Sequence, residues 1–248
     1  MSLPVRTLSG WPSVRRSLVS VQIGRRTYYS IHHPETAPFP PAQAAILTSA
    51  LQHVPRLGFT QEALTAGAQS AGYREASTLL FPRGSYDLIR YHLITERLTL
   101  KDRVQFQQDD KLGLTEKVKR LVVARLLANK DTIEHWQDAL GQMSLLENIP
   151  ASLTELGNLA DEIWYLAGDK SVDFSWYTKR AQLSAVYASS ELYMTTDKSP
   201  GFKDTEDFVE RRLGDAKTVG GTVGGLMNYA GWWAGNGIGL ARAWGMKV

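Results

Sequence analysis

Between residues 42 and 218, apolar residues recur at three- and four-residue spacing, and no segment shows a sustained two-residue alternation. The first pattern indicates helices that bury one face, whereas the second would indicate half-buried strands. Asn148-Ile149-Pro150 interrupts one such pattern and Ser199-Pro200-Gly201 ends another. The sequence therefore predicts an all-α domain over 42–218. The clearest apolar stripes are Leu114, Val118, Leu121, Val122 and Leu126 in one helix and Leu153, Leu156, Leu159 and Ile163 in another.

Residues 1–34 differ in composition from the rest of the chain. They hold five arginines and no acidic residue, with serines and short apolar stretches, which is typical of a mitochondrial transit peptide. A disordered basic tail is the alternative. The rest of the chain holds 23 of the 28 basic residues and all 25 acidic ones, so the pI near 9.0 reflects the leader. Prolines crowd the next residues, and we place a linker at 35–41.

Residues 219–248 are rich in glycine and tryptophan, and no charge falls between Lys217 and Arg242. Each interior glycine costs a helix about 1 kcal/mol relative to alanine, so an apolar environment is needed to order this tail, and Trp and Tyr favour the membrane interface. Three interpretations stay open: an amphipathic helix in the interface, a membrane-spanning helix and a flexible tail. The predicted membrane contacts are Leu226, Tyr229, Trp232, Trp233, Leu240 and Trp244.

Residues 46–81 resemble the helix-turn-helix entry of the TetR-type all-α fold. Helices are expected at 46–53, 62–69 and 73–81, with Thr60 capping the second and Gly72 in the tight turn after it. A third helix that reads DNA would carry basic or polar residues, but 73–81 holds one Arg, one Glu and an apolar end. Over 42–100, five basic residues face four acidic ones, which argues against phosphate binding.

Two Trp-Tyr pairs, Trp164-Tyr165 and Trp176-Tyr177, lie within the charged segment 161–180. Neighbouring residues on a helix point about 100° apart, so the two members of a pair can hardly face one core. Part of this aromatic area is therefore expected to face a partner, and burial of Trp176 in the core is the alternative. In the first pair, we expect Trp164 beside the partner surface and Tyr165 in the core.

Residues suited to catalysis or metal binding form no recognisable set. The absence of cysteine excludes disulfides, thiolate zinc sites and a cysteine nucleophile. The five histidines make no HxxxH, HExxH or di-iron motif, and Gly235, Gly237 and Gly239 follow no strand. Glu134-His135 lacks a third group that would complete a site, so a solvated pair is expected. We predict no catalytic residue, no metal site and no cofactor.

Several unusual motifs occur in one order along residues 43–213: Ile133-Glu134-His135-Trp136, Asn148-Ile149-Pro150-Ala151-Ser152-Leu153, Ala167-Gly168-Asp169, DFSWYTKR at 173–180, Glu191-Leu192, and Phe202-Lys203-Asp204-Thr205 with Phe208 and Arg211. This series resembles the mitochondrial lipid-binding accessory proteins of ubiquinone biosynthesis, a family often called coenzyme Q protein nine. The tail departs from the resemblance, because it holds more glycine than the amphipathic last helix of that family.

The resemblance implies a TetR-like homodimer without nucleic-acid binding, ending in an amphipathic membrane-binding helix on the matrix face of the inner mitochondrial membrane. It implies an isoprenoid or quinone-type lipid as ligand and no enzymatic activity. The implied role is to present substrate to the di-iron demethoxyubiquinone hydroxylase, beside other ubiquinone-biosynthesis proteins. The partner-binding residues carried over from the family are Asp161, Ile163, Trp164, Trp176, Tyr177 and Arg180.

Two other classes of function stay open from the sequence. A TetR-like transcriptional regulator would use the helix-turn-helix, and its nearly neutral charge disfavours that use. An enzyme that acts on the lipid itself would need a converging set of titratable groups in the cavity.

Overall fold

The structure of the protein is a computed structural model that describes residues 39–106, 112–169 and 175–219. The predicted leader and the six predicted membrane contacts of the tail lie outside these ranges. Within them the chain forms helices and turns and contains no strand, which confirms the all-α fold class. None of the described helices is long and apolar enough to cross a membrane.

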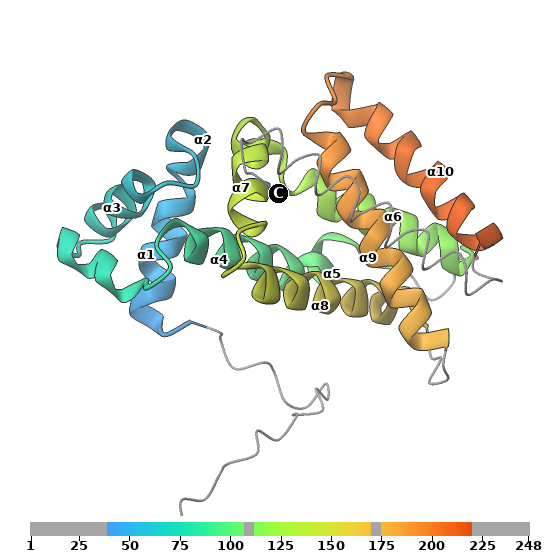
Figure 1. The fold of residues 1–248 in the computed structure, drawn as a ribbon, viewed down its shortest axis with the longest axis horizontal. Coiled ribbons are helices and arrows are strands. Elements are labelled where there is room, and N and C mark those ends of the chain that lie inside the picture. Colours follow the sequence, from blue (N-terminus) through green and yellow to red (C-terminus); the bar gives the residue numbers. More distant parts are fainter. Residues whose placement is uncertain (1–38, 107–111, 170–174, 220–248) are drawn as a thin grey trace, which may run out of the picture. The chain divides into compact units, whose positions relative to one another are not determined.

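The helices fall into a head and a body that meet along α4 (Figure 1). The head comprises α1 (Pro41–Leu51), α2 (Val54–Leu57), α3 (Gln61–Ser70), η1 (Glu75–Leu80), α4 (Ser85–Leu98), η2 (Lys130–His135) and α7 (Trp136–Met143). The body comprises α5 (Leu100–Arg103), α6 (Leu114–Leu127), α8 (Ile149–Ala167), α9 (Ser175–Met194), η3 (Pro200–Phe202) and α10 (Lys203–Val219).

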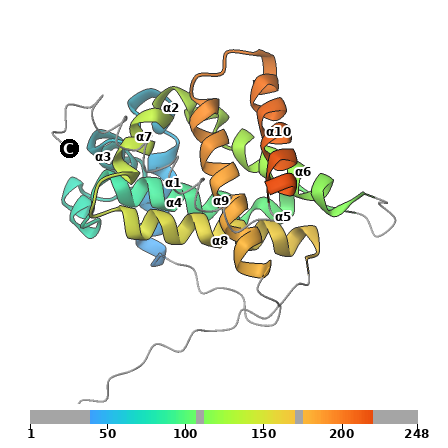
Figure 2. The ribbon, with the colours of Figure 1, turned by 45° about the vertical axis from the view of Figure 1, so that its right-hand side comes forward.

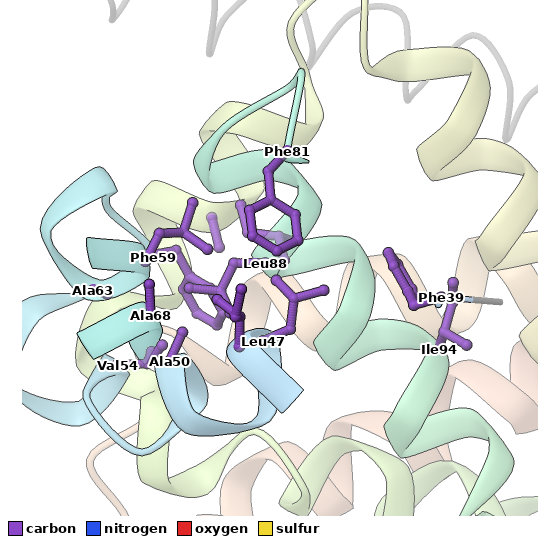
Figure 3. Close-up of a cluster of buried hydrophobic side chains, with 14 of the residues drawn as sticks. Phe39, Leu47, Ala50, Val54, Phe59, Ala63, Ala68, Phe81, Leu88 and Ile94 are labelled. Atoms are coloured by element: carbon purple, nitrogen blue, oxygen red, sulfur yellow. The ribbon is translucent and has the colours of Figure 1, made fainter. Parts of the chain in front are cut away.

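The head forms around the close packing of α1 against α3. Thr60 begins α3, because its hydroxyl accepts a hydrogen bond from the Ala63 amide at 3.3 Å, as predicted. Gly67 lets the two helices approach, since a Cβ there would lie 2.5 Å from the Ala50 backbone. Figure 3 shows the buried cluster that results, in which Leu47 and Ala50 of α1 and Ala63 and Ala68 of α3 lie near Phe59.

The third helix expected in the head, at 73–81, is wrong. Gly72 makes the predicted turn with φ 79°, but the next element is η1, a six-residue 3-10 helix that buries no side chain. Pro82 explains the early end, because a residue before proline is pushed out of the α conformation, and Phe81 has φ −112° and ψ 88°. This segment therefore provides no regular helix that could lie in the major groove of DNA.

The body is a bundle in which α6, α8, α9 and α10 bury one shared core. Figure 2 shows α9 crossing α8 and α10 lying beside α6. The predicted stripe of α6 is confirmed at Val118, Leu121, Val122 and Leu126 but wrong at Leu114, which is 39% exposed. The stripe predicted for α8 is confirmed at Leu159 and Ile163 but wrong at Leu153, which is 62% exposed. Direction around the helix does not explain this, because Ala160 lies two turns later on the same side of α8 and is buried; Leu153 is exposed because of its place near the beginning of α8.

Candidate functional site

The predicted partner residues lie where the end of α8 meets the beginning of α9 (Figure 1). α8 ends at Ala167, and the next residue, Gly168, has a φ of 90°, a left-handed conformation that glycine adopts readily because it lacks a Cβ. The amides of Gly168 and Asp169 then donate to the Tyr165 and Trp164 carbonyls at 3.0 Å, which closes the helix end. This termination leaves the last two turns of α8 beside the first two turns of α9.

Trp176 is half-buried and is held by a cation and a carboxylate. The guanidinium carbon of Arg180 lies 3.7 Å from the centre of the indole ring, a short cation–π contact. Arg180 also donates from Nε to Asp161 Oδ1 at 2.5 Å and from Nη1 to the Trp176 carbonyl at 3.3 Å. Asp161 on α8 thus fixes Arg180, and Arg180 fixes the ring on α9.

Trp164 has a matching arrangement on α8. Its indole Nε1 donates to the Lys179 carbonyl at 3.2 Å. The Lys179 ammonium lies 5.6 Å from the ring centre and 3.1 Å from Asp169 Oδ1. Lys179 was not singled out from the sequence, although its place three residues after Trp176 indicated that the two lie near one side of the same helix.

Tyr177 projects from this arrangement. Its side chain is 69% exposed, and its ring meets that of Trp176 edge-to-face, with centres 4.7 Å apart and planes at 76°. Tyr165, expected in the core, is 58% exposed; it lies about 100° around α8 from Trp164, on the outer side. The expectation for Tyr165 is therefore wrong. We call Asp161, Trp164, Trp176, Tyr177, Lys179 and Arg180 the aromatic patch.

Ile163 does not belong to this patch. Its side chain is completely buried in the core of the body, on the face of α8 that packs against α6 and α9. A side chain without exposed area cannot contact a partner, so we correct its predicted role to that of a core residue. The structure thus brings five of the six predicted partner residues together at the surface.

The chemistry of the aromatic patch suits recognition of a partner. It offers ring faces and edges, one phenol hydroxyl, and cations already occupied by carboxylates. In the part of the chain that the structure describes, no group of three or more His, Asp or Glu side chains is placed to hold a metal. Aromatic and Arg side chains of this kind are enriched at the centres of protein interfaces.

A buried polar network, which the sequence did not reveal, lies at the junction of head and body. Asn129 Oδ1 accepts from Arg125 Nη1 at 3.0 Å and from His92 Nε2 at 2.9 Å. Its Nδ2 donates to Glu191 Oε1 at 3.1 Å, which also accepts from the Tyr187 hydroxyl at 3.2 Å. These bonds satisfy polar groups that would otherwise be costly to bury.

Burial shifts the proton equilibria of this network. It lowers the pKa of His92 to about 4, with the nearby Arg125 charge acting in the same direction. It raises the pKa of Glu191 and, well above its ordinary value, that of Tyr187. His92 is therefore neutral near pH 7 and donates from Nε2. The side chains of these groups are buried, so we assign them to stability.

Comparisons with known proteins agree with this architecture. Two family models match, one described as COQ9 over residues 149–220 and one as the N-terminal domain of ubiquinone biosynthesis protein COQ9 over residues 42–69. Among solved structures, the TetR transcriptional regulator of Nitrosomonas europaea superposes with a TM-score of 0.56 over 73% of this chain and 100% of that one. Its 13% identity shows a shared fold alone.

Curated relatives are closer in sequence. The mitochondrial ubiquinone biosynthesis protein coq9 of Schizosaccharomyces pombe is 39% identical over 217 residues, which cover 88% of this chain and 86% of the relative. The mitochondrial human protein COQ9 is 42% identical over 189 residues, and the match spans 73% of this chain and 59% of the human one. The chain therefore belongs to the COQ9 family of mitochondrial ubiquinone biosynthesis proteins.

Proposed function

We propose that this chain is a non-enzymatic accessory protein of ubiquinone biosynthesis. In this proposal it binds an isoprenoid or quinone-type lipid and docks on the matrix face of the inner mitochondrial membrane. There it presents the lipid to the di-iron demethoxyubiquinone hydroxylase. We expect it to act as a homodimer, and to work beside other proteins of the pathway.

The aromatic patch is the observation that carries the proposal. An exposed Tyr177 beside a Trp176 that is held in place gives a partner a rigid apolar anchor. Fixing the ring in advance lowers the entropy lost on binding. Membership of a ubiquinone-biosynthesis family makes an enzyme of that pathway the expected partner, and the resemblance of the motif around Trp176 to the family's partner-binding patch favours the hydroxylase.

The membrane part of the proposal rests on the composition of the tail. Trp232, Trp233 and Trp244 would lie in the interface, with Leu226, Tyr229 and Leu240 beside them. A chain truncated after Lys217 should lose its flotation with cardiolipin-containing liposomes, while the full chain floats. Equal flotation of both chains would contradict membrane docking by the tail.

Lipid binding is tested by extraction of the purified full-length protein into organic solvent and mass spectrometry of the extract. We expect a quinone or polyisoprenoid lipid in near-stoichiometric amount. Ordinary membrane phospholipid alone, in an amount that an unrelated control protein also carries, would contradict the lipid-presenting function.

A TetR-like transcriptional regulator is the alternative, and it rests on the fold alone. In this chain the third segment of the helix-turn-helix is the short η1, flanked by two arginines, Arg74 and Arg83. Arg83 lies 3.5 Å from Asp87 in an ion pair, which removes it from phosphate recognition. Salt-dependent, sequence-selective DNA binding by the purified protein would favour the regulator.

A further inference from the structure

The aromatic patch and the point from which the tail leaves lie at the same end of the body. α10 returns beside α9 in the opposite direction (Figure 1), and Tyr193 near the end of α9 stacks on Phe208 near the beginning of α10, with ring centres 4.6 Å apart. From this contact, Trp176 lies about 26 Å back along α9 and Val219 about 17 Å forward along α10, at 1.5 Å per residue. The tail therefore begins about 9 Å short of the level of Trp176 and about 10 Å, one helix spacing, to the side.

The aromatic patch suits an uncharged, aromatic occupant. Tyr177 is 69% exposed, and both cations of the patch are paired, Arg180 with Asp161 and Lys179 with Asp169. The patch therefore offers aromatic area together with charges that already neutralise one another. The outer face of α10, which also lies beside the start of the tail, carries exposed charged side chains instead. An apolar segment that covered that face would remove those charges from water at a cost in free energy.

The tail has the composition that the patch requires. Residues 218–241 hold no Asp, Glu, Lys or Arg and include Tyr229, Trp232 and Trp233. Removing such aromatic area from water is favourable, and pairs of aromatic rings add to the gain. The ten residues from Val219 to Tyr229 reach up to about 33 Å when extended, which exceeds the distance to the patch. The tail can therefore reach the aromatic patch of its own chain.

We propose that the tail, residues 220–248, covers the aromatic patch of its own chain when no membrane is present. This inference rests on the proposed function, because it takes the membrane as the competitor for the tail and the hydroxylase as the competitor for the patch. The same tryptophans cannot lie in a membrane interface and against Trp176 at once. A membrane surface therefore withdraws the tail from the patch, and the hydroxylase binds tightly only beside a membrane.

Disulfide formation between two introduced cysteines tests the contact directly, because the chain has no cysteine of its own. Ala181 is exposed and lies one turn after Tyr177 on α9, and Ala234 follows Trp233 in the tail. The full-length protein with Ala181→Cys and Ala234→Cys is oxidised mildly without lipid and run on a non-reducing gel. We expect a disulfide within one chain, and cardiolipin-containing liposomes should slow its formation.

The matched control combines Ala234→Cys with Gly113→Cys. Gly113 is exposed, has an ordinary φ of −66° and directly precedes α6. α6 ends at the junction with the head, beside Asn129, so Gly113 lies at the end of the body where the tail begins. Without lipid, the control pair should form its disulfide about tenfold more slowly than the pair at the patch, because the local concentration of the tail is highest there. Equal rates for the two pairs would overturn the inference.

Truncation after Lys217 tests the consequence for the partner. Without lipid, the truncated chain should bind the purified hydroxylase about tenfold more tightly than the full chain, since a patch that is covered in about nine chains of ten has a tenfold lower apparent affinity. Equal affinity of the two chains would overturn the inference, and so would a disulfide that joins two chains. Unchanged hydroxylase binding in Trp176→Lys would instead refute the partner site of the proposed function, while the disulfide rates still decide whether the tail covers the patch.

Discussion

Two clusters in this protein are built around tryptophan and serve opposite purposes. At the junction of head and body, Phe59, His92 and Trp136 meet edge-to-face, with ring centres 5.2 to 5.9 Å apart, and Trp136 has no exposed area. In the aromatic patch, cations cover the rings of Trp164 and Trp176 and carboxylates hold the cations. The first cluster stabilises the fold, and the second presents a rigid surface.

The largest expected effect is on stability at the junction. Trp136→Ala removes a fully buried ring and should lower the free energy of unfolding by about 3–5 kcal/mol. Urea unfolding monitored by circular dichroism measures it. A loss below about 1 kcal/mol would show that the cavity closes or that the ring is not packed as described.

Trp176→Lys tests the opposite side of the comparison. It should weaken hydroxylase binding about a hundredfold, as expected for an anchor at the centre of an interface. The free energy of unfolding should change by less than about 1 kcal/mol, because the ring is only half-buried. Titration calorimetry and urea unfolding on the same samples give both numbers; unchanged affinity would refute the assignment of the patch.

The junction should also respond to pH in a way that the patch does not. The folded pKa of His92, about 4, lies below its ordinary 6.5. As the pH falls, His92 therefore becomes protonated in the unfolded chain before it does so in the folded chain. Stability is therefore lost as the pH falls from about 6.5 towards 4, by about 2 kcal/mol between pH 7 and 5. The raised pKa of Glu191 offsets part of this loss, since its folded form takes up a proton more readily.

His92→Gln isolates this contribution. Glutamine retains a donor for Asn129 Oδ1 and does not titrate. The loss of unfolding free energy between pH 7 and 5 should therefore be smaller in this variant by most of the ~2 kcal/mol that we assign to His92. Unfolding midpoints in urea at several pH values measure it. An unchanged pH profile in this variant would assign the acid sensitivity to other groups.

The smallest effect concerns the cation above Trp176. Arg180→Gln removes the cation–π contact and the bond to Asp161, and should weaken hydroxylase binding about fivefold, or about 1 kcal/mol. Arg180→Lys should recover only part of the affinity, because an ammonium lacks the planar fork of guanidinium. Tryptophan emission should shift to longer wavelength in Arg180→Gln as the ring becomes mobile; full affinity in that variant would show that Trp176 needs no support.

Local features of the fold could be predicted from the sequence, while features set by distant residues could not. The stripe of α6 and the Thr60 cap depend on neighbours in the chain, and both were predicted. Periodicity could not tell that Leu153, near the beginning of α8, would stay exposed, or that Tyr165 faces outward. Pro82 is a local signal against a full third helix, which the prediction of a helix over 73–81 did not take into account.

Some residues of the candidate site could likewise be predicted from the sequence, while others could not. Trp176 and Tyr177 were singled out because adjacent aromatic residues cannot share one core. Ile163 was carried over from a family motif, although the predicted apolar stripe already placed it on the buried face, and the structure confirms the stripe there. The network around Asn129 joins it to Glu191, 62 residues away, and nothing in the sequence near Asn129 indicates such a partner.

Hydrogen–deuterium exchange with and without the hydroxylase tests the central claim most directly. We expect slower exchange in the complex over residues 161–169 and 175–181, and no change over Lys130–Met143, which surrounds Trp136. Protection confined to the head, or protection of Lys130–Met143 with none at the aromatic patch, would contradict the account.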